Sequence, residues 1–312
     1  MFNATHTIWN EKHRPQTLDM YVGNETIKTT FKQYIESNDV PHLLLYGDAG
    51  SGKTTLAKIV ANSIAKNNYI YINASDENSV DTVRDKIKQF ASSIGFGGLK
   101  LIILDESDYL TPNAQAALRN VIETFSKTTR FILTCNYIDK IIDPIQSRCQ
   151  IFNIVPPSKK EVAKHLVSLL DSEGVKYGKE DVVTIINANY PDIRRVINST
   201  QRCVIGGTLK LDETTLVEHN YMPTIVEILK SNKNKKEKFD TIRQIVADNN
   251  IRDYNQLIRY LYDNVDSYAN GFTSSVVIAL AEAQYKDSLV VDHEINTMAM
   301  FIQIIMEIEQ RR

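Results

Sequence analysis

Apolar and polar residues follow two different rhythms along the chain. In the first half, short apolar runs typical of buried strands alternate with segments whose apolar residues recur every three or four positions, as on one face of a helix. This alternation indicates a parallel sheet covered by helices on both faces. The predicted strands are His42–Tyr46, Tyr69–Asn73, Leu101–Asp105, Arg130–Cys135 and Ile151–Val155, with helices near 53–66, 79–93 and 112–126.

The pattern changes after residue 156, where only the helical spacing remains. Ser158 and Glu161 form a capping-box pattern at the start of this region. A break near Tyr221–Pro223 then separates a small group of helices from a longer helical segment. The helices predicted here are 158–172, 179–189, 192–205 and a long apolar-striped one at 292–310.

A glycine-rich segment stands between the first strand and the helix that follows it. LYGDAGSGKTTLAK, residues 45 to 58, fits the P-loop spacing G-x-x-x-x-G-K-[ST], with Gly47, Gly52, Lys53 and Thr54 in the fixed positions. Backbone N–H groups and the positive end of the helix dipole converge on phosphate in such a turn. The lysine reaches the outer phosphates, and the threonine hydroxyl can ligate Mg²⁺. The flanking strand and helix disfavour the alternative, a glycine turn beside a surface lysine.

Carboxylate and amide side chains follow two further strands. LKLIILDESD ends an apolar strand with Asp105 and Glu106. The first can hold Mg²⁺ through water, and the second can polarise an attacking water. FILTCN ends the next strand with Asn136, and the carboxyl ends of parallel strands line the ligand crevice. Asn136 can therefore contact the γ-phosphate or the attacking water; the alternatives are a surface carboxylate for Glu106 and a turn residue for Asn136.

Two arginine segments are ambiguous on spacing alone. Arg148, in IQSRCQ, lies past the phosphate site of its own core and can either serve the site of a neighbouring subunit or form a local ion pair. PDIRRVIN opens a helix with Asp192 as the expected cap and Arg194 and Arg195 in the first turn. Cations are disfavoured at a helix N-terminus, so a bound anion such as ATP would relieve this placement. Surface charge is the alternative.

Composition limits the class of protein further. The chain has 312 residues, enough for two or three domains. Its net charge is −2, which argues against a protein that binds polyanions over its whole surface. Three well-separated cysteines indicate free thiols in a reducing compartment. We find neither a secretory leader pattern nor an apolar run near the ~20 residues that cross a bilayer. We therefore expect a cytoplasmic protein without a membrane partner.

Together these motifs resemble the AAA+ ATPases and, more narrowly, the small subunits of sliding-clamp loaders, of the replication factor C type and its tailed-phage counterpart. WNEKHRPQTLDMYVGN is similar to the family's opening W-x-E-K-Y-R-P-x-x-L-x-x-x-V-G, with His13 in place of Tyr. The final segment, AEAQYKDSLVVDHEINTMAMFIQ, looks most like the collar of the phage form. Between them, in the family's order, stand PHLLLYGDAGSGKTT, NASDENSVDTVRDKIKQF, LDESD, AQAALRNVIE, TCN, QSRC and PDIRRVIN.

The resemblance implies a fold and a role for each matching residue. We expect an AAA+ P-loop core at 1–156, a helical lid at 157–222 and a helical collar domain for oligomerisation at 223–312. Asp105 would support Mg²⁺, Glu106 would be the base, Asn136 and Arg194 would be sensors, and Arg148 would act in trans. ATP and Mg²⁺ would be held by Gly50, Ser51, Gly52, Lys53, Thr54 and Thr55, with Glu11, Lys12, His13, Arg14 and Val22 on the adenine and ribose side.

DNA contacts are expected on the helix after NASD. Arg84 and Lys88 lie one helical turn apart and therefore share a face. They can meet backbone phosphates, which gives affinity without sequence preference. The alternative for both is solvated surface charge.

The implied function is that of an ATPase subunit in a clamp loader. Copies of the chain and a distinct subunit would form a pentamer, in which ATP binding opens a ring-shaped sliding clamp and engages primer–template DNA. DNA-triggered hydrolysis would release the closed clamp, in the host cytoplasm if the gene is a phage's. The alternatives are another AAA+ machine, such as a helicase loader or branch-migration motor, and a scaffold subunit that binds ATP without hydrolysis. NASDENS has no pore-loop aromatic residue, which disfavours a motor that threads its substrate. Lys53, Glu106 and Arg148 are intact, which disfavours the scaffold that binds ATP without hydrolysis.

Overall fold

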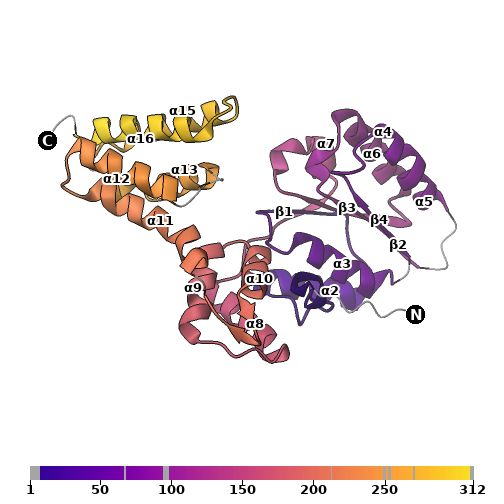
Figure 1. Ribbon diagram of the computed structural model, residues 1–312. Coiled ribbons are helices and arrows are strands. Elements are labelled where there is room, and N and C mark those ends of the chain that lie inside the picture. Colours follow the sequence, from indigo (N-terminus) through magenta and orange to yellow (C-terminus); the bar gives the residue numbers. More distant parts are fainter. Residues whose placement is uncertain are drawn as a thin grey trace. The chain divides into compact units, whose positions relative to one another are not determined.

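The computed structural model describes residues 8–66, 68–93, 98–211, 213–248, 251, 254–269 and 271–309, without the side chains of residues 84 and 213–220. The chain divides into two compact units, Met1–Lys210 and Leu211–Arg312 (Figure 1). Each unit has its own hydrophobic core. Among the described residues, we find no helix with the length and apolar content needed to cross a membrane.

The first unit is built on a parallel sheet of five strands in the order β2-β3-β4-β1-β5. The predicted α/β core with a parallel sheet is therefore confirmed. Each strand lies where an apolar run predicted one, and the three central strands are almost wholly buried. The strands are β1 (Leu43–Tyr46), β2 (Tyr69–Asn73), β3 (Lys100–Asp105), β4 (Thr129–Cys135) and β5 (Gln150–Asn153).

Helices cover both faces of this sheet (Figure 1). Successive side chains of a strand point to opposite faces. Leu43 and Leu45 accordingly pack with α2 and α3, while Leu44 packs in the cluster of α6 on the other face. The helices of the core are α1 (Trp9–Lys12), α2 (Glu25–Ser37), α3 (Lys53–Ile64), α4 (Val80–Thr82), the π turn η1 (Val83–Ile87), α5 (Lys88–Ser92), α6 (Pro112–Phe125) and α7 (Asp143–Gln146), with 3₁₀ turns η2 (Ser107–Tyr109) and η3 (Ile138–Lys140).

The same unit continues into three helices and a small hairpin. Ser158 and Glu161 form both hydrogen bonds of the predicted capping box at the start of α8. The N–H of Trp9 in α1 donates to Gln201 Oε1 in α10 at 3.0 Å, which ties this region to the start of the chain. The predicted helix 192–205 ends early, at Arg202. The elements are α8 (Lys159–Ser172), α9 (Lys179–Asn189), α10 (Ile193–Arg202), β6 (Val204–Ile205) and β7 (Thr208–Leu209).

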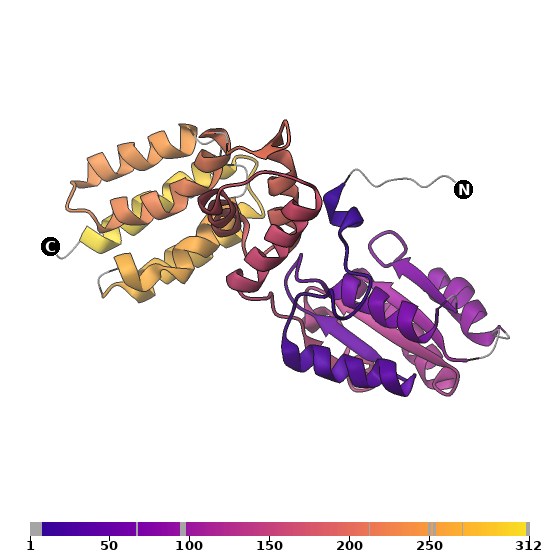
Figure 2. The ribbon, with the colours of Figure 1, turned by 90° about the horizontal axis from the view of Figure 1, so that it is seen from below.

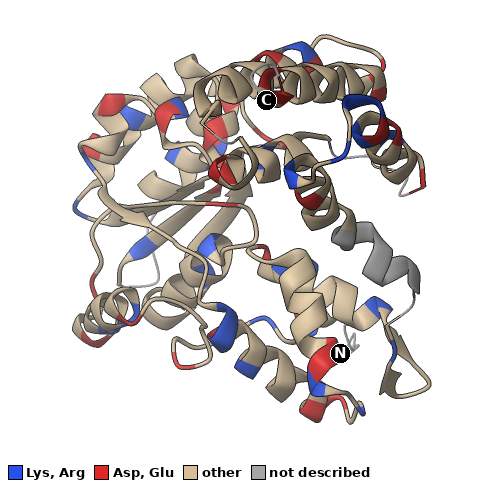
Figure 3. Cartoon of the chain, turned by 90° about the vertical axis from the view of Figure 1, so that its left-hand side faces the viewer, with Lys and Arg blue, Asp and Glu red and all other residues tan. Residues whose placement is uncertain are grey.

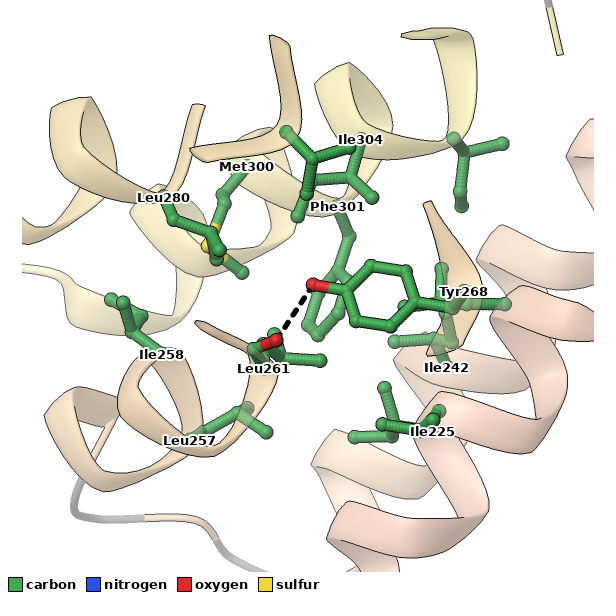
Figure 4. Close-up of a cluster of buried hydrophobic side chains, with 14 of the residues drawn as sticks. Ile225, Ile242, Leu257, Ile258, Leu261, Tyr268, Leu280, Met300, Phe301 and Ile304 are labelled. Atoms are coloured by element: carbon green, nitrogen blue, oxygen red, sulfur yellow. Dashed lines mark hydrogen bonds between the residues drawn. The ribbon is translucent and has the colours of Figure 1, made fainter. Parts of the chain in front are cut away.

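The second unit is helical, as predicted for the C-terminal region (Figure 2). Its core gathers side chains from every helix, among them the fully buried Tyr268, whose hydroxyl donates to Leu261 O at 3.0 Å (Figure 4). The helices are α11 (Glu213–Lys230), α12 (Lys235–Asp248), α13 (Tyr254–Asp263), α14 (Val265–Tyr268), α15 (Thr273–Asp287) and α16 (His293–Glu309).

The helical break predicted near Tyr221–Pro223 is not present. Helix α11 runs from Glu213 to Lys230 with Pro223 inside it. A proline lacks an N–H donor and normally interrupts a helix, but Met222 and Ile225 on either side are buried in the core of the second unit, and this packing favours a continuous helix. The predicted boundary at 222/223 thus falls within a helix, and the second unit begins at Leu211. The division between core and lid stays a prediction.

Candidate active site

The sheet order brings three polar strand ends together. The P-loop follows β1, Asp105 ends β3, and Asn136 directly follows β4. Because β4 lies between β1 and β3, Asn136 stands between the P-loop and the acidic residues. Residues that are far apart in sequence thus meet at the carboxyl edge of one parallel sheet, where ligands bind in open α/β folds.

The P-loop glycines are needed for conformation and for space. Gly50 and Gly52 have φ values of +74° and +97°, which other residues adopt only with strain. A Cβ atom on Gly50 would lie 2.0 Å from Oδ1 of Asp192, the cap of α10. A Cβ atom on Gly52 would lie 3.1 Å from the ring of Tyr21. The loop is therefore a tight cradle, with the start of α10 against one side and Tyr21 against another.

Lys53 is buried, at 8% exposure, and all three of its ammonium hydrogens have acceptors. Its Nζ donates to the carbonyls of Gly47 and Asp48 at 2.8 Å each and to Asn136 Oδ1 at 2.9 Å. Burial lowers the pKa of Lys53, and nearby acidic groups, Asp105 among them, oppose that shift. The cation is thus held at the mouth of the P-loop, in direct contact with the predicted sensor.

Asp105 is the centre of a cluster of hydroxyl groups. Thr54 Oγ1 at the start of α3 donates to its carboxylate at 2.8 and 3.0 Å. Thr134 Oγ1 on β4 donates at 2.5 Å, and the Tyr71 hydroxyl on β2 donates at 2.7 Å. Three different elements therefore fix the orientation of this carboxylate beside Thr54.

Glu106 has an unusual backbone conformation. Its φ of 55° and ψ of 43° lie in the left-handed region, which costs a non-glycine residue about 1 kcal/mol or more. The N–H of Glu106 donates to Thr134 Oγ1 at 3.1 Å. Strained residues of this kind concentrate at functional sites, where the surrounding structure maintains them. The turn leaves Glu106 lining the same pocket as the P-loop.

Asp108 supports the neighbouring loop. Its buried carboxylate accepts hydrogen bonds from the N–H groups of Asn136 and Tyr137, at 3.3 and 3.4 Å. The last acid of the DESD segment therefore contacts the backbone that carries the predicted sensor. Sequence reasoning assigned no role to this residue, because its partners follow another strand.

One pocket gathers most of the predicted site residues. Those that line it are His13, Arg14, Val22, Gly50, Ser51, Gly52, Lys53, Thr54, Thr55, Asp105, Glu106, Asn136 and Arg194. The pocket also contains residues that the motifs did not predict, among them Asn10, Tyr21, Thr134, Cys135 and His165. Burial, followed by the charge of His13, lowers the pKa of His165.

The residues of the N-terminal motif take different positions around this pocket. His13 lines it and also contacts the Glu173 carboxylate through Nε2. Lys12 pairs with the same carboxylate at 2.6 Å, and Glu11 pairs with Arg14. Glu11 and Lys12 are not among the residues that line the pocket within the described part of the chain. Their predicted contact with the nucleotide stays a prediction.

The two arginines at the start of α10 differ in their partners. Arg194 lines the pocket, while Arg195 pairs with the Asp192 carboxylate at 3.6 Å. Of the two arginines that the sequence left open, the structure therefore brings Arg194 to the site.

Arg148 lies outside the pocket, against the end of α6. Its NH2 group pairs with the Glu123 carboxylate, and its NH1 group donates to Pro144 O at 2.6 Å. The local ion pair, one of the two arrangements that the sequence left open, is therefore present within the chain, and a role in trans stays a prediction. On the helix after NASD, Lys88 is exposed, while the side chain of Arg84 lies outside the described part of the structure.

The site has the donor and acceptor groups that a magnesium nucleotide requires. Ser51 Oγ in the cradle is buried and has no hydrogen-bond partner among the described residues, so a polar group is needed there. Phosphate oxygens would accept from this hydroxyl, from Lys53 and from the first turn of α3. Thr54 and Asp105 offer the oxygen ligands that Mg²⁺ prefers. The residues present therefore fit ATP with Mg²⁺.

Comparison with known proteins agrees with this geometry. The profile of the "ATPase family associated with various cellular activities (AAA)" matches residues 43–157. A "Replication factor C small subunit" of Natronomonas pharaonis is 47% identical over 209 residues, which are 65% of this chain and 64% of that protein. Its counterpart in Archaeoglobus fulgidus is 43% identical over 66% of each chain. "Putative replication factor C small subunit L499" of Acanthamoeba polyphaga mimivirus is 40% identical over 311 residues, 91% of this chain and 90% of that protein.

Solved structures show the same fold at greater distance. The RuvB Holliday junction branch migration motor of Thermotoga maritima matches with a TM-score of 0.54 and 17% identity, over 80% of this chain and 90% of that one. The archaeal matches span slightly less than two thirds of the length of those proteins, 64% and 66%. The mimivirus match spans nearly the whole of both chains. The chain belongs to the replication factor C small subunits and carries an ATPase domain of the AAA family.

Proposed function

We propose that the chain is an ATP-hydrolysing subunit of a DNA polymerase sliding-clamp loader. ATP binding opens the clamp and engages primer–template DNA, and DNA-triggered hydrolysis then leaves the closed clamp on DNA. The observation that carries this proposal is the convergence of the P-loop, Asp105, Glu106 and Asn136 on one pocket, in a chain similar along nearly its whole length to a replication factor C small subunit.

The residues of the pocket divide the chemistry between them. The P-loop N–H groups and Lys53 would bind the phosphates of ATP, and Thr54 and Asp105 would hold Mg²⁺, which would neutralise charge on the phosphoryl oxygens. Glu106 accepts a proton from the attacking water, whose position Asn136 helps to fix. Arg194 brings a positive charge from α10 to the same pocket, so that the lid responds to the bound nucleotide.

The site is completed by Arg148 of an adjacent copy. Within one chain this guanidinium contacts Glu123 and does not line the pocket. An arginine that reaches a neighbouring site stabilises charge on the transferred phosphoryl group and accounts for on the order of 10³ or more in rate. Hydrolysis by a single subunit is accordingly slow.

An exposed apolar stripe on α16 supports assembly through the second unit. Ile295, Ala299, Ile302 and Met306 lie at helical spacing and are exposed, with 69%, 42% and 51% exposure for Ile295, Ile302 and Met306. A contiguous apolar face of this kind commonly marks a protein–protein interface. We assign it to contacts between subunits in a pentamer that includes a distinct partner subunit.

DNA binds along its phosphate backbone. Lys88 is exposed, and Arg84 lies one turn before it on the same helical segment. The two signs of charge are interspersed over the chain, in keeping with its net charge of −2 (Figure 3). Affinity for DNA therefore depends on a local basic surface rather than on the net charge, and it falls as salt concentration rises.

Transfer of the clamp to DNA tests this proposal. The chain, its partner subunit and the clamp would be incubated with primed circular DNA, and DNA-bound clamp separated by gel filtration. We expect ATP-dependent retention of the clamp on DNA. Glu106→Gln should retain ATP binding and clamp binding but lose turnover by a factor of about 10² or more. Retention that does not depend on ATP, or unchanged turnover in Glu106→Gln, would contradict the proposal.

A further inference from the structure

Tyr71 lies on the edge strand β2, outside every motif that points to the nucleotide site. In the parallel pairing of β2 with β3, Asn73 is opposite Asp105 and Tyr71 is opposite Ile103. Tyr71 is therefore the diagonal neighbour of Asp105 on the same face, a separation that a long aromatic side chain can span. Its hydroxyl donates to Asp105 Oδ2 at 2.7 Å.

The hydrogen bond from Tyr71 completes the set of contacts around this carboxylate. Oδ1 accepts from Thr54 and Thr134, and Oδ2 accepts from Tyr71 and, at 3.0 Å, from Thr54. A carboxylate has about four lone-pair directions, and three hydroxyl hydrogens, from Thr54, Thr134 and Tyr71, point at them. Among the described donors, Tyr71 is the one that contacts Oδ2 and not Oδ1. Its loss would leave Oδ2 with a single, shared hydroxyl and the carboxylate freer to rotate.

The ring of Tyr71 lies at the rim of the core rather than inside it. The side chain is 40% exposed, and Lys58 Nζ lies 4.5 Å above the ring centre. Lys58 is one helical turn after Thr54 on α3, so one helix contacts both the carboxylate and the tyrosine that holds it.

We infer that Tyr71 is a positioning residue for magnesium-dependent nucleotide binding, because its hydroxyl fixes the orientation of the Asp105 carboxylate beside Thr54. This inference rests on the proposed function, since it assigns Asp105 to the Mg²⁺ of a bound nucleotide. Tyr71 is not among the residues that line the pocket within the described part of the chain. Its contribution should therefore be confined to the Mg²⁺-dependent part of binding.

The test compares Tyr71→Phe with Tyr69→Phe. Tyr69 is two residues earlier on β2 and on the same face, and it packs in the cluster of α3, so its substitution controls for the loss of a phenol from this strand. ADP would be titrated calorimetrically into the full chain at a series of Mg²⁺ concentrations and in EDTA. For Tyr71→Phe we expect the Mg²⁺ concentration that gives half of the maximal change in ADP affinity to rise roughly three- to tenfold, as for loss of one hydrogen bond of typical net strength.

The affinity for ADP in EDTA should be the same in the wild type and both variants, because the P-loop is intact in each. An unchanged Mg²⁺ dependence in Tyr71→Phe, or an equal shift in Tyr69→Phe, would overturn the inference while leaving the proposed function in place. A loss of affinity in EDTA as well would indicate a merely structural role and overturn it too. A wild-type chain whose ADP binding ignores Mg²⁺ would overturn the proposed function, and this inference with it.

Discussion

At the scale of single residues, polar side chains of the site are held by partners from other elements. Lys53 contacts Asn136 across 83 residues of sequence, and Thr54 contacts Asp105 across 51. The hydroxyl of Thr134 serves both Asp105 and the backbone of Glu106. Such a network keeps the charged groups in place before a ligand binds, and preorganised groups need no rearrangement when charge develops.

His42 gives the folded state a dependence on pH that is separate from the site. Its Nδ1 accepts the N–H of Phe131 at 3.1 Å, and burial, then the charge of Arg130, lowers the pKa of His42 from 6.5 to about 4. In the unfolded chain His42 is protonated below about pH 6.5, whereas in the folded chain it stays neutral down to about pH 4. Stability from this group is therefore present above pH 6.5 and lost as the pH falls towards 4.

The loss should amount to no more than ~3 kcal/mol. Asparagine can place an acceptor oxygen near the position of Nδ1, so His42→Asn should flatten the dependence of unfolding free energy on pH between 6.5 and 4. Urea unfolding at several pH values measures this. Equal pH dependence in the wild type and the variant would show that His42 does not carry the effect.

At the scale of elements, the alternation of side chains along strands explains what the sequence could predict. The apolar runs located the five strands of the parallel sheet but not the short hairpin β6–β7, and the residues at the ends of β1, β3 and β4 pointed to the pocket. Because side chains alternate along β4, Thr134 lies on the same face as Ile132, which packs with α3. The alternation could therefore have predicted that Thr134 belongs to the site. Tyr71 was open to prediction in the same way, once the pairing of β2 with β3 is known.

Other features depend on contacts between distant segments, which no local pattern contains. The approach of Asp192 to Gly50 joins residues of two different regions of the first unit. The continuous helix α11 overrides the local signal of Pro223 through burial on both sides. Lys238 belongs to the lysine-rich segment 230–238, and a run of like charges is normally solvated, yet Lys238 is 2% exposed. In each case tertiary packing outweighs the local preference.

The buried Lys238 joins two helices of the second unit. Its Nζ lies 3.0 Å from the Glu309 carboxylate on α16 and donates to Leu229 O on α11 at 3.1 Å. Removal of one partner leaves a buried charge without compensation, which costs about 3–5 kcal/mol in comparable pairs. We expect Lys238→Ala to lower the unfolding free energy of the chain by an amount of this order, measured by urea unfolding.

Lys236→Ala is the matched control, because Lys236 is exposed on the same helix. It should change stability by less than about 0.5 kcal/mol. Comparable effects of the two substitutions would mean that the pair contributes nothing beyond loss of a lysine from α12.

At the scale of the whole molecule, the proposed activity requires several chains. Ile302 lies in the middle of the exposed stripe on α16, and Ile302→Asp would place a charge at the centre of the proposed interface. We expect this substitution to weaken assembly with the partner subunit at least tenfold, since a buried unpaired charge costs several kcal/mol. Sedimentation analysis of the mixture measures it.

The monomeric variant should remain folded, because Ile302 contributes little to the core of its own chain. Tyr262→Asp, a substitution at an exposed residue on α13, provides the comparison on another helix of the same unit. If the two substitutions weaken assembly equally, or neither does, the stripe on α16 is not the interface.

The central claim, that this chain hydrolyses ATP as part of a clamp loader, is tested most directly by its steady-state rate of ATP hydrolysis. The rate would be measured for the chain alone and then with primed DNA, the partner subunit and the clamp. The account predicts a slow basal rate that rises at least tenfold in the complete mixture and loses that rise in Arg148→Ala. A rate that is indifferent to every addition, or a stimulation that survives Arg148→Ala, would contradict it.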